Sequence, residues 1–266
     1  MVCFKDFWDK DSVSMRQCFA PVRNVVLLVA SCGLLAACST TGQDAASIAD
    51  PFEDVNRVTL SMNEAVDKAL LEPVARSYRA ATPGVFRAGM SNFLRNLRGP
   101  IDVANQALQG DMTGFGNSLA RVVINTLAGF GGILDIAEEG GIAYEREDFG
   151  QTLAKWGIGD GAYFVVPILG PSSLRDGFGL LVDSYADPLR LYLFNTDQEA
   201  WHYARVGAGV VSTREELIEV IDDLRQHSFD YYAAVRSAYQ QRRQALINDE
   251  DPELSSGPEI PDYDDF

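Results

Sequence analysis

Apolar side chains recur three or four positions apart along much of the chain, which is the spacing of one face of an α-helix. The first such series consists of Phe52, Val55, Val58, Met62, Val66 and Leu70. Asp50, Pro51 and Glu53 stand at its start as a helix cap, a first-turn proline and the acid of a capping box. Pro73 follows the series, so we expect a first helix that begins after Asp50 and ends before Pro73.

A glycine and a proline divide the next stretch. Thr82-Pro83 opens a second series, which runs from Val85 to Leu97 and meets Gly99-Pro100. Both residue types weaken a helix interior, so the pair predicts the end of this helix and a separate helix over Ile101–Gln109.

Three further caps predict helices later in the chain. Asp111 precedes a series that reaches Leu127, and Asp187-Pro188 repeats the pairing of a cap with a first-turn proline. The sequence STRE at 212–215 is another capping box. The apolar face of the helix predicted behind it holds Leu217, Ile221, Leu224, Tyr231, Val235 and Tyr239. The whole pattern predicts an all-α protein of short helices with little or no sheet.

One apolar segment does not follow the helical spacing. Residues 157–171 (GIGDGAYFVVPILGP) combine flexible backbone with large apolar side chains. A buried strand or extended core segment is one interpretation of such a run between glycines and prolines. A surface that faces lipid is the other, and the pattern leaves both open.

The N-terminal segment has the pattern of an export signal. An apolar run, VVLLVASCGLLAA at 25–37, follows Arg16 and Arg23 and leads directly into Cys38. The run suits a signal peptide and is shorter than the roughly 20 residues that cross a bilayer. Its end, LAAC, matches the lipobox of bacterial lipoproteins, in which the cysteine is acylated and becomes the new N-terminus. We therefore predict a lipoprotein signal peptide over residues 1–37 and lipidation of Cys38.

Two details bear on this prediction. Cys32 also ends a lipobox-like sequence, VASC, but cleavage there would leave a second apolar run in the mature protein. Several aspartates precede Met15, which is unusual for the basic start of a signal peptide and favours Met15 over Met1 as the initiator.

The net charge of the chain argues against one class of partner, and local composition divides the mature chain into three parts. The formal charge is -16, which argues against a nucleic-acid partner because phosphate contacts need a basic surface. Residues 38–49 are small and polar and form a lipidated tether, and residues 50–247 hold the predicted helices. Residues 248–266 are rich in Asp and Glu and contain no Lys or Arg, which is typical of a disordered acidic tail.

The residue types that most enzymes need are scarce. His202 and His227 are the only histidines and stand in no metal-ligand pattern. The sequence has no G-x-S-x-G nucleophile elbow, phosphate-binding loop or dinucleotide fingerprint. Neighbouring acids such as Glu215-Glu216 are typical of solvated faces. We therefore expect no catalytic residues, no metal and no cofactor, in a protein that is not an enzyme.

Four ordered blocks resemble the MlaA (VacJ) family of outer-membrane lipoproteins. The first, DPFEDVNR, contains Asp50, Pro51, Phe52, Asn56 and Arg57 and lies shortly after Cys38. The others are SNFLRNL at 91–97, RVVINT at 121–126 with GFGGILD at 129–135, and FGQTL at 149–153 leading on to LRD at 174–176. The blocks are more specific as an ordered set than singly.

The resemblance implies a ring-shaped assembly of short amphipathic helices around an amphipathic channel. Such a protein lies in the inner leaflet of the outer membrane, is anchored by its lipid and faces the periplasm of a Gram-negative bacterium. It takes phospholipids that have strayed into the outer leaflet and passes them to a soluble periplasmic carrier, which maintains lipid asymmetry. Trimeric porins are further partners. Ser39, in place of an Asp after the lipidated cysteine, favours outer-membrane sorting.

Composition suggests where lipid would pass. We place the path near Phe149, Tyr163, Phe164, Val165 and Pro167, where apolar side chains meet irregular backbone. Two alternatives remain. One is a structural or porin-docking lipoprotein without a conduit, and the other is a phospholipid-cleaving enzyme, which the missing nucleophile motif disfavours.

Overall fold

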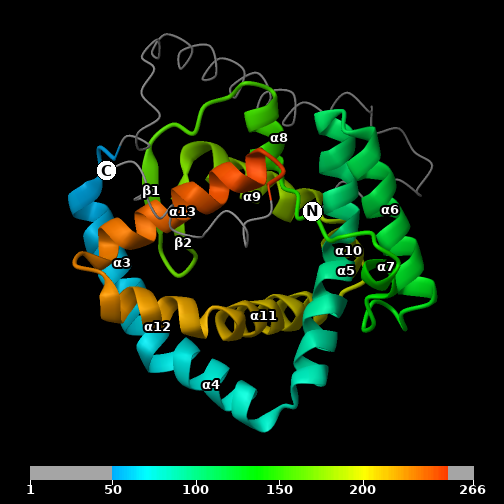
Figure 1. Cartoon of the computed structure of the whole chain (residues 1–266), viewed down its shortest axis with the longest axis horizontal. Helices are drawn as coiled ribbons and strands as arrows, with labels where there is room; N and C mark the ends of the chain where they lie inside the picture. Colours follow the sequence, from blue (N-terminus) through cyan, green and yellow to red (C-terminus); the bar gives the residue numbers. More distant parts are fainter. Residues whose placement is uncertain (1–49, 251–266) are drawn as a thin grey trace, which may run out of the picture. The chain divides into compact units, whose positions relative to one another are not determined.

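The computed structural model describes residues 50–250 (Figure 1), so the predicted signal peptide, Cys38, the tether and most of the acidic tail lie outside the described residues. The described part is almost entirely helical. Its helices are α3 (Glu53–Val66), α4 (Glu72–Ala81), α5 (Gly84–Gln109), α6 (Met112–Leu127), α7 (Ile136–Glu139), α8 (Phe149–Lys155), α9 (Leu174–Ala186), α10 (Pro188–Asn195), α11 (Glu199–Glu216), α12 (Ile218–His227) and α13 (Tyr231–Ile247). A π-helical segment, η2 (Asp67–Leu71), joins α3 to α4, and a hairpin consists of β1 (Tyr163–Val166) and β2 (Gly170–Ser173). The predicted all-α class is confirmed.

The elements of residues 50–250 follow one another around a circuit in Figure 1. The blue and cyan helices α3 and α4 lie at the left and bottom, and α5 rises on the right beside α6. The hairpin, α8 and α9 continue the circuit across the top. α11 then packs against α4, and α13 packs against α8 and β2. This arrangement agrees with the expected ring of short helices.

Two helix starts follow their sequence signals. Asp111 accepts hydrogen bonds from the backbone N–H groups of Thr113 and Gly114, both at 3.0 Å, and α6 begins at the next residue. Asp187 accepts one from the backbone N–H of Leu189 at 3.0 Å, and the proline after it opens α10. In both cases the donor and acceptor lie within three residues, so local chemistry determines the outcome.

Asp50 does not cap the first helix, contrary to prediction. α3 begins at Glu53, and its capping position, Phe52, forms no side-chain hydrogen bond. The Asp50 carboxylate instead accepts hydrogen bonds from Asn56 Nδ2 at 2.8 Å and from the Tyr232 hydroxyl. A partner on α13, far away in sequence, therefore takes the place of the local cap.

The two predicted proline stops are also wrong. Pro73 lies in the first turn of α4, where proline is tolerated, and η2 carries the helix on from α3 without a break. Pro100 lies inside α5, which replaces the two predicted helices with one of 26 residues. At the preceding Gly99 a Cβ would lie 2.3 Å from Val122 Cγ2, so the glycine permits close packing of α5 on α6. This packing stabilises α5 across Gly99-Pro100, a pair of residues that would weaken the helix in isolation.

The capping box predicted at 212–215 is wrong for a similar reason. These residues lie near the end of α11, and the Glu215 carboxylate accepts a hydrogen bond from Arg79 Nε on α4 at 2.7 Å. The apolar face predicted from 217 to 239 is divided between α12 and α13. Asp230 accepts a hydrogen bond from the backbone N–H of Tyr232 at 3.0 Å and begins the second of these helices.

The glycine-rich segment forms the hairpin. β1 and β2 pair antiparallel, with Tyr163 opposite Ser173. The side chains of Tyr163 and Val165 are buried, whereas Ile168 and Leu169 in the turn are exposed. The strand interpretation is therefore correct for β1, and the turn presents an apolar surface.

Candidate functional site

The apolar face predicted for the first helix points away from the interior. Phe52, Val55, Val58, Met62, Val66 and Leu70 are all exposed, from 41% at Val66 to 64% at Val55. The opposite face carries the buried Asn56. In a protein surrounded by water, the apolar face of a helix packs against the core and the polar face is solvated. Here the two faces are exchanged.

The same exchange recurs on α5 and α6, whose buried residues are polar, charged or glycine. Other elements also expose apolar side chains, and we call the combined surface the apolar exterior. Besides the α3 series it comprises Val85, Phe86 and Met90 on α5, Leu119, Val123 and Leu127 on α6, Phe130, Ile133 and Leu134 in the following loop, and Leu191, Tyr192, Trp201 and Tyr203 on α10 and α11. Extensive apolar exposure marks contact with another protein or with a membrane. No helix between residues 50 and 250 is long and apolar enough to span a bilayer.

Ion pairs occupy much of the interior. Among the described residues, more polar or charged side chains than apolar ones are buried. Arg243 on α13 donates to both carboxylate oxygens of Asp148 at 2.7 Å and to Asp176 at 3.0 Å. Arg214 on α11 makes a similar bidentate contact, in which its Nε and Nη2 donate to the two carboxylate oxygens of Asp67 at 2.6 and 2.9 Å. Such paired bonds fix both the distance and the orientation of the elements that they join.

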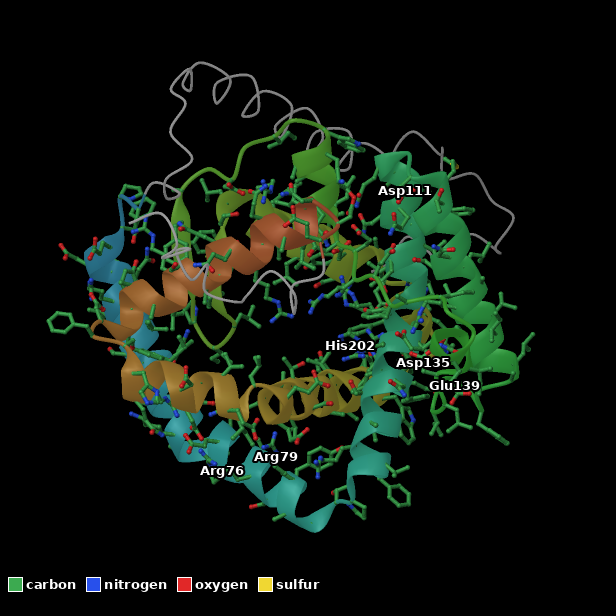
Figure 2. All side chains as sticks on the ribbon, viewed as in Figure 1. Arg76, Arg79, Asp111, Asp135, Glu139 and His202 are labelled. Carbon is green, nitrogen blue, oxygen red and sulfur yellow. The ribbon has the colours of Figure 1, made fainter. Side chains whose placement is uncertain are left out.

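Charged side chains also join α4 to α11 and α12. Figure 2 shows Arg76 and Arg79 on the side of α4 that faces these helices. Arg79 pairs with Glu215 and Glu219, and Arg76 pairs with Asp222 at 2.6 Å. The contact therefore depends on charge where a soluble helix pair would use apolar side chains.

A small apolar core joins the hairpin to α3 and α13. It consists of Leu60, Tyr163, Val165 and Tyr232, and the rings of Tyr163 and Tyr232 meet edge-on with centroids 6.3 Å apart. Asn56 fixes the strand beside it. Its Nδ2 donates to the carbonyl of Tyr163 at 3.3 Å, and its Oδ1 accepts from the backbone N–H of Val165 at 2.9 Å.

The first block of the resemblance thus has a structural role. Arg57 donates to Asp230 at 2.7 and 3.1 Å and lies 4.4 Å from the ring centroid of Tyr232. Together with Asp50 and Asn56 it ties the start of α3 to α13 and to the hairpin. The other two motif residues, a proline and a phenylalanine at 51–52, are exposed.

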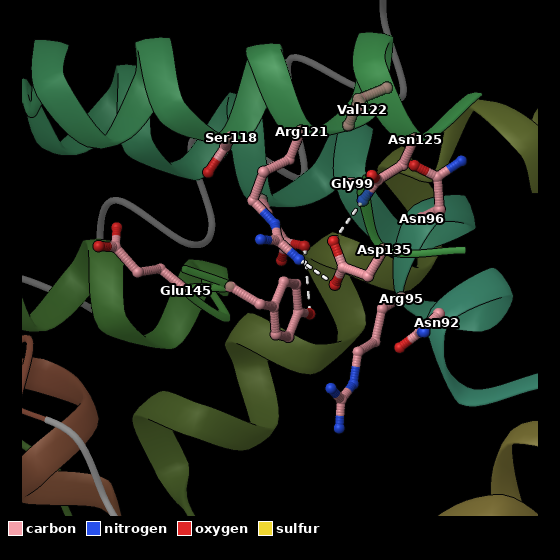
Figure 3. A pocket seen from close by; sticks show the side chains of 12 residues that line it. Asn92, Arg95, Asn96, Gly99, Ser118, Arg121, Val122, Asn125, Asp135 and Glu145 are labelled. Carbon is pink, nitrogen blue, oxygen red and sulfur yellow. Dashed lines mark hydrogen bonds and ion pairs between the residues drawn. The ribbon is translucent and has the colours of Figure 1, made fainter. Parts of the chain in front are cut away.

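A small polar pocket lies between α5, α6 and the segment around Asp135 (Figure 3). Its volume of about 20 Å³ has room for a water molecule rather than an acyl chain. Figure 3 shows Arg121 and Asn125 on α6 reaching Asp135, and the Asn125 Nδ2 to Asp135 Oδ1 distance is 2.9 Å. Gly132, with φ +97°, passes so close to Asn96 that a Cβ would lie 2.3 Å from the Asn96 Cβ. The second and third blocks of the resemblance therefore hold this loop against α5 and α6.

A second polar group, the Asp102 cluster, lies where α5 meets α8 and α9. It consists of Arg98, Asp102, Asn105, Glu147, Thr152 and Asp183. Asp102 accepts hydrogen bonds from Arg98 Nε and from the backbone N–H of Glu147, both at 3.2 Å. Asn105 donates to Asp183 at 3.1 Å and accepts from Thr152 at 2.8 Å. Burial raises the pKa of Asp102 to about 6 and that of Glu147 to about 7, so both acids bind protons more readily than exposed ones.

The residues predicted to line a lipid path are not all accessible. Tyr163 and Val165 are 0% and 5% exposed and belong to the core. Phe149 is half-buried at the start of α8. Its ring meets the ring of the exposed Trp156 edge-on, with centroids 5.9 Å apart. Phe164 is half-buried and Pro167 is exposed. The path stays a prediction for Phe149, Phe164 and Pro167, whereas Tyr163 and Val165 pack the hairpin.

His202, on α11, is labelled in Figure 2. Its ring packs among aromatic rings, with its centroid 5.4 Å from that of Phe194 and 5.6 Å from that of Tyr203. Burial, followed by the charges of Arg205 and Arg190, lowers its pKa, which favours the neutral ring. Within residues 50–250 no three His, Cys, Asp or Glu side chains are grouped so that they could hold a metal ion.

Sequence reasoning missed the Asp102 cluster. One signal was available, since Arg95, Arg98, Asp102, Asn105 and Gln109 recur at helical spacing along α5. A polar stripe of this kind is ordinarily the solvated face of a helix. Its role in the interior becomes apparent only when the apolar face of the same helix is seen to point outward.

The chain resembles known proteins along most of its length. The family model described as MlaA lipoprotein matches residues 48–246. The "intermembrane phospholipid transport system lipoprotein MlaA" of Escherichia coli (strain K12) is 32% identical over 219 residues, which cover 81% of this chain and 85% of that protein. An uncharacterised protein of Rickettsia prowazekii (strain Madrid E) is 33% identical over 199 residues, 74% of this chain and 78% of that one.

A solved structure supports the same conclusion. It comes from work on the "structural basis for maintenance of bacterial outer membrane lipid asymmetry" and is 33% identical in sequence. The match has a TM-score of 0.67 and covers 75% of this chain and 100% of the solved chain. Sequence blocks, family match and structural likeness agree, and the chain belongs to the MlaA lipoprotein family.

Proposed function

We propose that the protein removes mislocalised phospholipids from the outer leaflet of the outer membrane and passes them to a soluble periplasmic carrier. The relatives from Escherichia coli and Haemophilus influenzae are named as lipoproteins of an intermembrane phospholipid transport system. The identity of about one third extends over most of both chains, which supports the transfer of this role.

The exchange of apolar and polar faces is the observation that carries the proposal. The apolar exterior can rest among acyl chains, where each Å² removed from water contributes about 25 cal/mol. The buried ion pairs hold the fold together without a large apolar core, and they give the interior a polar character. A phospholipid likewise has an apolar part, its acyl chains, and a charged part, its headgroup. A protein with an apolar outside and a polar inside can lie in one leaflet and still offer a route to a charged headgroup.

The remaining features complete the proposal. Cys38 carries the acyl chains that anchor the protein in the inner leaflet, and the folded part faces the periplasm. Lipid passes through a central channel near Phe149, Phe164 and Pro167. A trimeric porin is the membrane partner that positions the protein, and the transport is retrograde, toward the inner membrane. Neither catalytic chemistry nor a cofactor is part of this function.

A structural or porin-docking lipoprotein without a conduit is the second candidate. The pocket between α5 and α6, at about 20 Å³, is too small for a lipid and would be no part of a conduit. In this alternative the apolar exterior would serve only to seat the protein in the membrane.

A deletion strain tests the proposed function. Loss of the protein should raise the amount of phospholipid that an added phospholipase can reach from outside the cell, and it should sensitise cells to detergent. Complementation with the wild-type chain should reverse both effects, and Cys38→Ala should reverse neither. Unchanged surface phospholipid in the deletion strain would contradict the transport role. Detergent sensitivity without surface phospholipid would favour the scaffold.

A further inference from the structure

A concavity lies where η2 and α4 meet α12. Its volume is about 360 Å³, and its walls are formed by Lys68, Glu72, Pro73, Arg76 and Arg225. Lys68 belongs to η2 and Arg225 to α12, so the tertiary structure assembles the concavity from distant parts of the sequence. Small-molecule sites in proteins have volumes of roughly 300–1,000 Å³. This concavity is therefore large enough for a small polar group.

Two cations in the wall keep hydrogen-bond donors available for a ligand. Lys68 Nζ lies 2.7 Å from Glu64 and has no other ion-pair partner among residues 50–250. Arg76 (Figure 2) donates through Nε to Glu72 at 3.0 Å and through Nη2 to Asp222 at 2.6 and 2.9 Å, while its Nη1 makes no hydrogen bond within the same range. The side chains of Lys68 and Arg76 are 57% and 46% exposed. Ion pairs at such exposure contribute little, and a ligand can share or replace them.

A carboxylate held in position lies beside these cations. Glu72 accepts a hydrogen bond at each oxygen, from Arg76 Nε at 3.0 Å and from Arg225 Nη1 at 2.7 Å. Arg225 is itself held by Asp67, to which its Nη2 donates at 2.8 Å. An ionised carboxylate has about four acceptor sites, so Glu72 can still accept from a further donor such as an ammonium group.

The charges in and around the concavity balance, since its cations are matched by an equal number of acids within ion-pair distance. The cations are Lys68, Arg76, Arg214 and Arg225, and the acids are Glu64, Asp67, Glu72 and Asp222. A ligand with a net negative charge gains little from this balance. A ligand that carries one negative and one positive group is complementary to it, because each group meets its opposite.

An apolar edge borders the concavity. Pro73 forms part of the wall and is exposed. Leu70, three residues earlier on the same continuous helix, is 57% exposed and belongs to the apolar exterior, and Val74, next to Pro73, is 42% exposed. A lipid whose acyl chains lie along this surface can place its headgroup in the concavity.

We propose that this concavity binds the headgroup of a zwitterionic phospholipid, with the phosphate at Lys68 and Arg76 and the ammonium group at Glu72. The inference rests on the proposed function and adds to it a headgroup preference. Hydrogen bonds between oppositely charged groups are shorter and stronger than neutral ones, so the three side chains together select for both charges of the ligand. The apolar edge selects for a lipid over a soluble zwitterion.

Lipid preference is the first readout. Full-length protein is purified in a non-ionic detergent, short-chain lipids with identical tails are titrated, and native mass spectrometry measures the bound molecules. Wild type should bind dihexanoyl-phosphatidylethanolamine about tenfold more tightly than dihexanoyl-phosphatidylglycerol, because only the former offers an ammonium group to Glu72. Glu72→Gln should bind the two lipids equally. Glycerophosphoethanolamine, which has the same headgroup and no acyl chains, should not compete at millimolar concentration.

Matched variants separate binding from stability. Arg76→Gln should bind the ethanolamine lipid about tenfold more weakly than wild type, and so should Lys68→Gln, which loses only a surface ion pair and should fold normally. Arg57→Gln is the control, because Arg57 has the same arrangement of partners, Glu53 one turn earlier and Asp230 on another element, and lies outside the concavity. It should lower the thermal midpoint as much as Arg76→Gln does and leave lipid binding unchanged.

The inference and the proposed function fail in different ways. Equal affinity of wild type for the two lipids would overturn the headgroup site, and so would unchanged lipid binding in both Arg76→Gln and Lys68→Gln. Competition by glycerophosphoethanolamine would also overturn it, because the site would then take a free zwitterion. The transport role would stand in each case. Unchanged surface phospholipid in the deletion strain would contradict that role and leave a measured headgroup preference in place.

Discussion

Asn56 offers a direct test of how the hairpin is held. Its amide makes three hydrogen bonds, one to Asp50 and one each to the backbone of Tyr163 and Val165, and the residue is 2% exposed. Asn63, two turns further along α3, binds the other end of the same strand. It donates to the carbonyl of Val166 at 2.9 Å and accepts from the backbone N–H of the exposed Ile168 at 2.7 Å. The two asparagines therefore form a matched pair that differs in burial.

The loss in the free energy of unfolding depends on which backbone groups each substitution leaves without a hydrogen-bond partner. Asn56→Ala removes the partner of two buried backbone groups, each costing about 1–3 kcal/mol when unsatisfied, so the free energy of unfolding should fall by about 3 kcal/mol. Asn63→Ala should cost only about 1 kcal/mol, because water can replace the lost bond at Ile168. Asn56→Asp should be no better than Asn56→Ala, since it places a second carboxylate against that of Asp50.

Thermal unfolding of the full-length protein in detergent, followed by circular dichroism, measures these differences. At about 2–4 °C per kcal/mol for a domain of this size, Asn56→Ala should lower the midpoint by roughly 6–12 °C and Asn63→Ala by a few degrees. Equal midpoints for the two alanine variants would refute the reasoning, because burial would then not set the cost. So would a loss of less than about 0.5 kcal/mol at Asn56.

Three further predictions concern the interior. Because burial raises the pKa of Glu147 from 4.5 to about 7, the folded state should lose up to roughly 3 kcal/mol of stability as pH rises between these values. Glu147→Gln should remove that decline in the midpoint, and an unaltered pH profile would contradict it. Gly99→Ala should destabilise by about 1–3 kcal/mol through the clash with Val122, and Val122→Ala should reverse most of the loss in a double-mutant cycle. Arg243→Gln should cost about 3–5 kcal/mol in thermal unfolding because it leaves the carboxylate of Asp148 without an ion-pair partner among residues 50–250, whereas Asp176 keeps Arg175. Adding Asp148→Asn should recover part of that loss.

The sequence could predict those helix ends that depend on neighbours along the chain. Asp111 caps its helix without another hydrogen-bond partner among residues 50–250, and Asp187 caps through Oδ1 while Arg205 binds its Oδ2, so in both cases an oxygen is left for the local N–H groups. Asp50 and Glu215 had equally good local signals, but Tyr232 and Arg79 bind them from distant elements. A capping signal states what a carboxylate can do, and only the tertiary structure shows which donor reaches it.

The direction of the helix faces could not be predicted from their spacing. An apolar stripe shows that one face differs from the other, and it does not show whether that face meets a core or a lipid. The lipobox predicted to end at Cys38 was the feature of the sequence that indicated a membrane-bound protein. For the same reason the lipid path was predicted from apolar composition alone, and it included Tyr163 and Val165, which pack the core.

The apolar exterior also has a thermal consequence. The heat capacity of unfolding grows with the apolar surface that becomes newly hydrated, and it is about 12–15 cal/mol/K per residue in ordinary domains. In residues 50–250 much of that surface is accessible before unfolding begins. We therefore expect a smaller heat-capacity increment per residue and a flatter dependence of stability on temperature. Lipid around the exterior would restore a larger increment, because unfolding would then have to bring that surface into water.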